Sequence, residues 1–292
     1  MATPAQYRDR IQELKRQFEE LKFGKDQLLK LIDEAEIPEN VYNSNAIENS
    51  TLTLKETEKI LLELEVARNI DVREVYEARN LARVVEYIRG KSQGEDISPE
   101  LILLLHQMLL GGIDDSIAGR FRRINEYVRV GTHIAPDPTH IERLLEQALI
   151  DYASDHQTFF SDKIAKFHLE FETIHPFNDG NGRIGRVLIN YQLLRLGFPP
   201  VIIRNKEKGD YYASFSDYRD KNDTKRMERI LALALMESLH KRLAYLKGQK
   251  IIKVAEYAKR TGEPVNALLN AARRQTIPAF REKGSWMIGT RK

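Results

Sequence analysis

Apolar residues recur at helical spacing through most of this chain. Residues 6–36 carry two apolar stripes, 11–23 and 28–32, which indicate a charged amphipathic helix or a helical hairpin. We expect this segment to end at Pro38, because proline interrupts the hydrogen bonds of a helix interior, and a short separate piece to follow over 39–50. Further helices are predicted over 53–67, 73–91, 98–110, 139–155, 164–174, 187–196, 210–218 and 225–246. The predicted fold class is all-α.

Two of these helices have recognisable starts. Thr53-Leu-Lys-Glu56 has the spacing of a capping box, and Ser98-Pro-Glu100 places a capping side chain before a proline at the first helical position. The polar stretch 92–96 interrupts the helical pattern between the helices predicted over 73–91 and 98–110. We therefore divide the chain into an N-terminal helical region, 1–95, and a core domain, 96–246.

One segment alternates as a strand does. Residues 126–134 read Glu-Tyr-Val-Arg-Val-Gly-Thr-His-Ile, and the helical period disappears on both sides of them. Alternation of this kind predicts a short β-hairpin.

The C-terminal part, 247–292, follows another plan. Two short helices, 254–261 and 265–274, flank a Gly-Glu-Pro turn, and the segments 277–280 and 285–288 are predicted to form a two-stranded wing. Helix, turn, helix and wing is the arrangement of a winged helix-turn-helix module.

Charge separates this module from the rest of the chain. The whole protein has a net charge of +3, yet residues 247–292 hold 11 Lys and Arg against three Asp and Glu, a net charge of +8. A basic module of this size suggests a polyanionic partner, most simply DNA. A solvated basic face, a protein-docking module or a dimer-packing module are the alternatives.

Composition narrows the classes of protein to which this chain can belong. The chain has no cysteine, so disulfides and thiolate metal sites are excluded. No apolar run approaches the roughly 18 residues of a membrane span, and the first residues lack a signal-peptide pattern. We expect a cytoplasmic protein with no membrane partner.

The densest chemistry lies in the stretch His175-Pro-Phe-Asn-Asp-Gly-Asn-Gly-Arg-Ile-Gly-Arg186. Its position between two apolar-periodic segments predicts a tight loop that opens the second helix. Glycine lets the backbone turn sharply and approach a ligand, and the N–H groups of a helix start attract anions. Arg183 and Arg186 add full positive charges. The stretch is therefore predicted to hold phosphates.

The other side chains of the loop complete a site for phosphoryl or nucleotidyl transfer. His175 is a candidate general base, and Asp179 is a candidate ligand for Mg²⁺ against phosphate oxygens. Asn181 can donate hydrogen bonds to a phosphoryl oxygen, and Phe177 is expected to fasten the loop to the core. The sequence has no P-loop motif. His168, two helical turns before His175, is expected to be a packed or hydrogen-bonded residue.

This loop resembles the signature of the Fic-domain family, His-x-Phe-x-Asp/Glu-Gly-Asn-Gly-Arg-x-x-Arg, at every defined position. The resemblance extends from about residue 44 to about residue 246, and implies a Fic-type helical domain with a β-hairpin flap. Most members of the family transfer AMP from ATP to a hydroxyl side chain of a protein. The resemblance therefore implies an adenylyltransferase that uses ATP and Mg²⁺ on the Ser, Thr or Tyr of a target, itself included. Many relatives dimerise, so a homodimer is a further expectation.

Roles for individual residues follow from the resemblance. His175 is implied to deprotonate the target hydroxyl, Asp179 to hold Mg²⁺, and Arg186 to anchor the γ-phosphate. Val128 to Gly131 fall where the flap of the family lines the nucleotide site, and Tyr211 falls where relatives contact adenosine. The full set of implied nucleotide-binding residues is Val128, Arg129, Val130, Gly131, Asp179, Gly180, Asn181, Gly182, Arg183, Ile184, Gly185, Arg186 and Tyr211.

Residues Ser44-Asn-Ala-Ile-Glu-Asn49 match the inhibitory motif of the family, Ser/Thr-x-x-x-Glu-Gly/Asn. Upstream of a Fic signature in one chain, this motif implies that Ser44, Glu48 and Asn49 form an inhibitory element. Glu48 would pair with Arg186, so that ATP binds with its α-phosphate out of line for attack.

The resemblance leaves three functions open. The first is protein adenylylation, inhibited in cis by Glu48. The second is removal of AMP from a modified protein, with Glu48 positioning a water. The third is a DNA-binding regulator in which the Fic core senses nucleotide.

Overall fold

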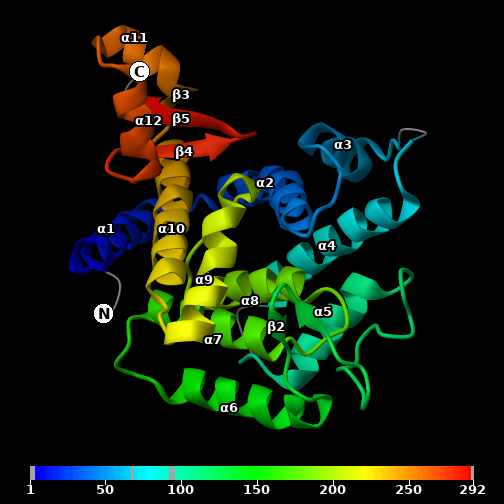
Figure 1. Cartoon of the computed structure of the whole chain (residues 1–292). Coiled ribbons are helices and arrows are strands. Elements are labelled where there is room, and N and C mark those ends of the chain that lie inside the picture. Colours follow the sequence, from blue (N-terminus) through cyan, green and yellow to red (C-terminus); the bar gives the residue numbers. More distant parts are fainter. Residues whose placement is uncertain (1–3, 67–68, 92–95, 291–292) are drawn as a thin grey trace.

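The computed structural model describes residues 4–66, 69–91 and 96–290. The chain is mostly helical (Figure 1), as predicted. Within these ranges, no helix combines the length and apolarity needed to cross a bilayer. The helices before the C-terminal module are α1 (Ala5–Lys22), α2 (Asp26–Ile47), α3 (Leu54–Glu58), η1 (Lys59–Glu63), α4 (Val72–Lys91), α5 (Pro99–Leu110), η2 (Pro138–His140), α6 (Ile141–Ser154), α7 (Phe160–Ile174), α8 (Asn181–Arg195), η3 (Asn205–Glu207), α9 (Lys208–Lys221) and α10 (Lys225–Leu246).

The first two helices are joined by a short turn at 23–25, and α2 corrects a prediction. α2 continues through Pro38 to Ile47, so 39–50 is no separate piece. A proline inside a helix costs about 3 kcal/mol. Ile37 and Val41, on either side of Pro38, are buried in the core, and Glu34, whose carbonyl loses its helical partner, is exposed. Packing on one side and solvent on the other let the helix continue, which carries Ser44 on its last turn.

The segment predicted as one helix over 53–67 is also shorter. Its capping box is present: the Thr53 side chain accepts a hydrogen bond from Glu56 N, and Glu56 Oε2 accepts one from Thr53 N. The α-helix then changes to the π-helix η1 and stops at Leu64, which adopts a left-handed conformation. Leu62 and Leu64 are exposed, so their apolar pattern does not mark a buried face. The predicted end at Ala67 lies outside the described residues.

Helix α8 lies between two hydrophobic cores. Ile184, Val187 and Leu188 face a core built from α2, α4, α5, α6 and α7. Ile189 and Leu193 face a second core built from α1, α7, α9 and α10. Both cores draw on helices from each side of the predicted boundary at 95/96, which itself borders residues outside the described ranges. The glycine-rich loop that precedes α8 is therefore held at the junction of the two cores.

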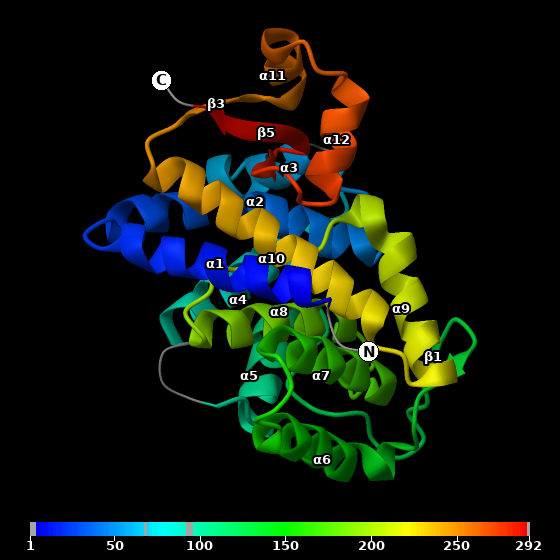
Figure 2. The ribbon, with the colours of Figure 1, turned by 90° about the vertical axis from the view of Figure 1, so that its left-hand side faces the viewer.

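The C-terminal module is packed against the end of α10 (Figures 1 and 2). It consists of β3 (Lys250–Lys253), α11 (Val254–Thr261), α12 (Val265–Arg273), β4 (Ala279–Glu282) and β5 (Ser285–Thr290). The expected wing of two strands is a three-stranded antiparallel sheet in the order β3-β5-β4. The sequence pattern did not predict β3, because its two adjacent isoleucines are flanked by lysines and do not alternate with polar residues. Ile252 and Ile288 pair across this sheet and are buried in a third core.

The predicted hairpin is present as β1 (Arg129–Val130) and β2 (His133–Ile134). Gly131 at its turn has a φ of +60°, a conformation that costs other residues more.

Candidate active site

The loop between α7 and α8 turns through two left-handed residues. His175 ends α7 with a φ of +50°, and its N–H still bonds to Phe171 O at 2.9 Å. Gly180 precedes α8 with a φ of +84°. A Cβ on Gly180 would lie 3.1 Å from the side chains of Leu109 and Leu110, so both conformation and space favour glycine there.

Asn181 closes the loop on itself. Its Oδ1 accepts a hydrogen bond from Phe177 N at 2.9 Å, and its Nδ2 donates one to Phe177 O at 2.8 Å. Both polar groups of this buried amide are therefore engaged within the loop. The Phe177 ring is fully buried and stacks on His106 with 3.7 Å between ring centroids, as expected for a residue that fastens the loop.

His106 is a loop-supporting residue that sequence reasoning missed. Its Nδ1 accepts a hydrogen bond from Gly119 N at 3.0 Å, which leaves the proton on Nε2, 3.0 Å from the carbonyl of Asp179. Burial lowers the pKa of His106 to about 4, so the neutral ring holds the backbone in place. A lone histidine in an apolar helix carries no signal of this role.

His175 lies in a mostly buried position. Burial lowers the pKa of its imidazole to about 4, so the ring is neutral at physiological pH. Its Nδ1 lies 3.8 Å from Glu172 Oε2. Burial, with the charge of Glu48 nearby, raises the pKa of Glu172 to about 8. At neutral pH the two groups are therefore a neutral base beside a largely protonated acid.

Arg122, also missed, joins the loop to the flap. Its Nε donates to His175 O at 2.9 Å, and its two other nitrogens donate to Glu126 O and Pro136 O, both at 3.0 Å. His133 on β2 lies 2.9 Å through Nε2 from Thr173 O on α7. These hydrogen bonds connect the hairpin to the end of α7, where the glycine-rich loop begins.

The predicted nucleotide residues of the flap differ in exposure. Arg129, Val130 and Gly131 are exposed, and Val128 is half-buried. The carbonyl of Val128 accepts from Ala135 N at 3.0 Å. Within the described ranges, none of these four residues forms a hydrogen bond with the side chain of Arg186 or Tyr211.

Asp179 is paired on both carboxylate oxygens. Oδ1 accepts from Arg183 at 2.9 Å and from Gly180 N at 2.6 Å, and Oδ2 accepts from Arg73 at 2.6 Å. Arg183 is buried and also pairs with Glu77 at 3.2 Å. Arg73, from α4, is another residue that no motif indicated.

The guanidinium of Arg186 is buried and surrounded by partners from distant segments. It donates to Ser44 Oγ at 3.0 Å, to Ser44 O at 2.8 Å and to Glu48 Oε1 at 2.8 Å. Its remaining nitrogen donates to the hydroxyl of Tyr211 at 3.2 Å. The chain therefore brings 44, 48, 186 and 211 together.

Glu48 is positioned by the end of α2. Asn49 directly after it adopts a φ of +70°, the left-handed conformation that asparagine tolerates better than most residues. Asn49 N bonds to Ala46 O at 3.1 Å, and Ser50 N to Asn45 O at 3.0 Å, which closes the helix. A Cβ on Gly182 would lie 2.1 Å from Glu48 Oε1. Glycine at 182 leaves the space in which this carboxylate lies, over the start of α8.

The remaining predicted residues line the inside of the site. Tyr211 is 1% exposed, and its hydroxyl, which accepts from Arg186, also lies 2.8 Å from His168 Nε2. The expected hydrogen-bonded role of His168 is confirmed. Tyr212 is 40% exposed, and its hydroxyl donates to Ile47 O at 2.5 Å. Tyr212 was not predicted, because the family resemblance pointed to its neighbour Tyr211.

Two residues of the motif have packing roles. The side chain of Ile184 is fully buried in the first core, so it points away from the loop surface. A Cβ on Gly185 would lie 2.5 Å from Glu172 Oε1 and 2.8 Å from the His168 ring. Glycine at 185 allows α7 and α8 to approach closely.

The loop offers one carboxylate as a candidate ligand for a magnesium ion. No group of three or more His, Asp or Glu side chains suited to a metal occurs within the described ranges. Asp179 is a single carboxylate, about one third exposed, at the start of a helix. Mg²⁺ in nucleotide sites is held by one or two carboxylates together with phosphates and waters. A single carboxylate fits this mode, and here it is engaged by Arg73 and Arg183.

The fold is that of a mostly helical domain built around one glycine-rich loop between two buried helices. Residues 96–193 match the profile of the Fic/DOC family. The chain carries a Fic domain.

Relatives of this chain extend the match on both sides. A protein of Drosophila melanogaster named "Protein adenylyltransferase Fic" is 32% identical over 254 residues, which cover 85% of this chain and 51% of the relative. The chain thus spans about half the length of the curated relatives it matches first.

Solved structures share the fold. A Fic-domain-containing signaling protein from Bacteroides thetaiotaomicron has a TM-score of 0.75 and 24% identity, covering 82% of this chain and 98% of the other. A Fic family protein from Desulfovibrio desulfuricans has a TM-score of 0.67 and 21% identity, covering 97% of this chain and 96% of the other. The second match includes the C-terminal module.

Proposed function

We propose that this chain is a protein adenylyltransferase that holds itself inhibited through Glu48. The observation that carries the proposal is the contact of Arg186 with Glu48 beside the complete Fic loop. Curated relatives that align with most of this chain are named protein adenylyltransferases, which supports the choice of reaction.

In the proposed reaction, a target hydroxyl attacks the α-phosphorus of ATP. A bond forms between the hydroxyl oxygen and this phosphorus, and the bond from the phosphorus to the bridging oxygen of the β-phosphate breaks. The products are an AMP-modified protein and pyrophosphate. His175, neutral because burial lowers its pKa, accepts the proton of the attacking hydroxyl.

The phosphates would bind along the start of α8. The backbone N–H groups of Gly180, Asn181 and Gly182, together with Arg183, would face the negative charge that increases during transfer. Asp179 would hold Mg²⁺, which supplies positive charge against the phosphate oxygens. Arg73 pairs with the same carboxylate, so it would exchange its place with the ion.

Inhibition follows from competition for one arginine. The proposed anchor of the γ-phosphate is Arg186, and its donors are engaged by Ser44, Glu48 and Tyr211. A triphosphate must displace Glu48 to gain that anchor. With Glu48 in place, the α-phosphate is not aligned with His175, and alignment is a large part of catalysis in group transfer.

The flap is proposed to hold the target. β1 is only two residues long and exposed, so an extended target segment can add to its edge by main-chain pairing. This arrangement would present a Ser, Thr or Tyr hydroxyl to His175.

The test uses the Glu48→Gly variant, in which Arg186 is free. The variant is incubated with ATP and with other nucleotides, each labelled at the α- and at the γ-position, in the presence of a cell lysate. Mass spectrometry of the labelled proteins is expected to find AMP on hydroxyl side chains, with ATP as the donor. Label from the γ-position alone would contradict adenylylation, and metal-dependent release of AMP from a modified target would favour the reverse reaction.

A second function, DNA binding, is proposed for residues 247–292. Helix α12 follows a tight turn after α11 and exposes Val265, Asn266 and Arg273, and the module has a net charge of +8. Surface of this kind on the second of two helices is suited to a DNA groove.

A further inference from the structure

The C-terminal module contacts the helix that carries Glu48. The turn between β4 and β5 donates two backbone hydrogen bonds, from Lys283 N and Gly284 N, to the carboxylate of Glu39 on α2, both at 3.1 Å. Glu39 is 5% exposed. A buried carboxylate depends on such partners, because water cannot replace them.

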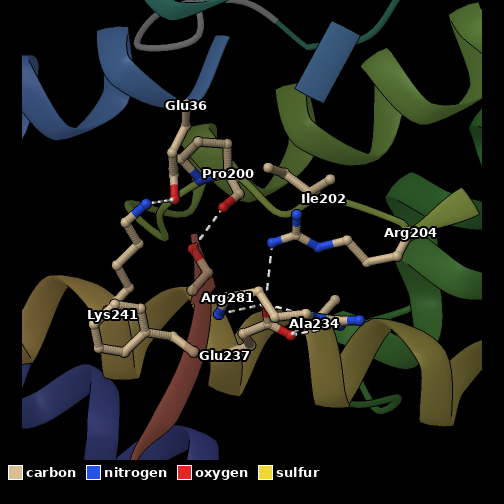
Figure 3. Close-up of a pocket in the computed structure, with 10 residues that line it drawn as sticks. Glu36, Pro200, Ile202, Arg204, Ala234, Glu237, Lys241 and Arg281 are labelled. Atoms are coloured by element: carbon tan, nitrogen blue, oxygen red, sulfur yellow. Dashed lines mark hydrogen bonds and ion pairs between the residues drawn. The ribbon is translucent and has the colours of Figure 1, made fainter. Parts of the chain in front are cut away.

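Glu39 is the first member of a buried row of alternating charges. Arg204, in the segment before η3, donates to Glu39 and also to Glu237 Oε1, the second at 3.0 Å. Glu237 on α10 accepts from Arg281 on β4 at 2.6 Å. Figure 3 shows Arg204 and Arg281 directed toward Glu237. The row therefore joins α2, α10 and the C-terminal module through side chains that exclude solvent.

A second bridge runs parallel to the first. Lys241 on α10 lies 3.1 Å from Glu36 Oε1 on α2 and 3.1 Å from Glu282 Oε1 on β4. Glu36 and Glu39 are three residues apart and lie on the same face of α2. The module is thus fastened to one face of this helix at two successive positions.

The contacts continue along α2 toward the inhibitory glutamate. Asn43, one turn after Glu39, accepts a hydrogen bond from Asn205 N at 3.0 Å, and Asn205 follows Arg204 in the chain. The next residue, Ser44, contacts Arg186. Glu48 caps α2 nine positions after Glu39, a rise of about 14 Å along the helix. A shift or rotation of α2 at Glu39 is therefore transmitted to Glu48 along a rigid helix.

We propose that Glu39 is a positioning residue through which the C-terminal module sets the place of Glu48 against Arg186. Replacement of the Glu39 carboxylate by an amide removes the negative charge and one of the two acceptor oxygens that Arg204 and the turn at 283–284 share. The end of α2 is then held less firmly, and Arg186 becomes available more often. The effect on activity rests on the proposed function above, whereas the effect on α2 does not.

The test compares Glu39→Gln with Glu34→Gln in the full-length chain. Both substitutions remove one carboxylate from α2, but Glu34 is exposed and pairs with Lys30 only at 3.8 Å. Hydrogen–deuterium exchange of residues 40–48 is expected to be on the order of tenfold faster in Glu39→Gln, as loss of a charge-assisted contact implies, and unchanged in Glu34→Gln. Equal exchange in the two variants overturns the proposal.

Activity gives a second readout that a merely structural role does not reproduce. Automodification is expected to rise in Glu39→Gln, and to be the same in Glu48→Gly with and without Glu39→Gln, because Glu39 acts through Glu48. The proposal is overturned if Glu39→Gln raises, or lowers, automodification by the same factor in the otherwise unmodified chain and in Glu48→Gly. Faster exchange without incorporation in any variant, Glu48→Gly included, supports the positioning of α2 and contradicts the adenylyltransferase instead.

If Glu39→Gln does not fold, Arg204→Lys is the alternative variant for the exchange experiment. Lysine keeps the charge but cannot span two carboxylates as the guanidinium does. Faster exchange over 40–48 is expected here as well, and unchanged exchange in this folded variant contradicts the proposal.

Discussion

Arg186 and Glu48 form an ion pair of 2.8 Å across 138 positions of sequence. Ser44, one turn earlier on the same helix, binds the same guanidinium with its hydroxyl and its carbonyl. Three contacts from one helix end hold a single arginine, while the opposite side of Glu48 remains exposed. The pair can therefore open toward solvent without disturbing either core.

Replacement of Glu48 by glycine is expected to raise automodification on the order of 10- to 100-fold. The variant removes one charge-assisted hydrogen bond from Arg186, and contacts of this kind contribute about 1.5–3 kcal/mol. Incorporation of label from α-labelled ATP measures the change. Glu146→Gly, a substitution at an exposed position of α6 away from the C-terminal module, is the control and is expected to match the unmodified chain. Incorporation no higher in Glu48→Gly than in the unmodified chain would refute inhibition by this residue.

The pH dependence of transfer is expected to follow the displaced pKa of His175. Burial lowers this pKa to about 4, so the base is neutral above that pH and loses activity as the pH falls through it. Removal of Glu48 takes away a negative charge that raises the value, and the pKa in Glu48→Gly is expected at or below 4. The profile of kcat/KM in that variant measures it, and His175→Ala in the same background is expected to abolish transfer. An acid limb near the ordinary value of about 6.5 would contradict this environment.

Asp179→Asn is expected to weaken the binding of an ATP analogue only when Mg²⁺ is present. The amide keeps the shape of the side chain but is a poor ligand for magnesium. We expect a loss of at least about tenfold in affinity with Mg²⁺, and little change in excess chelator. Calorimetric titration measures both conditions. Arg73→Ala provides the contrast, since it frees the carboxylate and is expected to tighten binding with Mg²⁺. A loss that is equal with and without the ion would remove Asp179 from the metal role.

Asn181→Ala is expected to destabilise the protein as well as inactivate it. Phe177 N and Phe177 O would both lose their buried partner, which costs about 2–6 kcal/mol for two such groups. Urea denaturation followed by circular dichroism measures the free energy of unfolding. Gln147→Ala, which removes an exposed amide from α6, is the comparison. Equal stability of the two variants would show that the loop does not depend on this amide.

Binding of duplex DNA by the full-length chain is expected to depend on Arg273 and Arg274 at the end of α12. Reversal of both charges to glutamate should abolish a mobility shift, and the shift should weaken steeply with salt because phosphate contacts release counterions. Arg16→Glu, at an exposed position of α1, is the control outside the module. Absence of any shift at low salt would instead favour a docking or packing role.

The sequence predicted those parts of the fold that neighbouring residues decide. Helical periodicity indicated most helices, and the capping box at Thr53 marked a helix start that is present. The alternation at 126–134 identified the hairpin. Failures occurred where packing overrode a local preference. Pro38 continues α2 because its flanks are buried, and Leu62 and Leu64 are exposed despite their apolar character.

The residues of the site also divide into those that the sequence predicted and those that only the structure showed. The glycines, the base and the arginines of 175–186 are contiguous, so their joint presence could be read from the chain. Arg73, His106, Arg122 and Tyr212 were missed because each lies far from the motif and belongs to an ordinary helix or loop. Their roles arise only when α4, α5, the flap and α9 meet around the loop.

By itself, the sequence determined which chemical groups are available and how the backbone turns near them, because glycine, proline and capping residues act within a few positions. Only the tertiary structure decided which groups share a buried environment. Burial sets the pKa of His175 and Glu172, and it makes Arg186 depend on a helix end 138 positions away. It likewise joins Glu39 of that helix to the C-terminal turn. Such couplings depend on distance in space and on exclusion of water, and neither can be read from order along the chain.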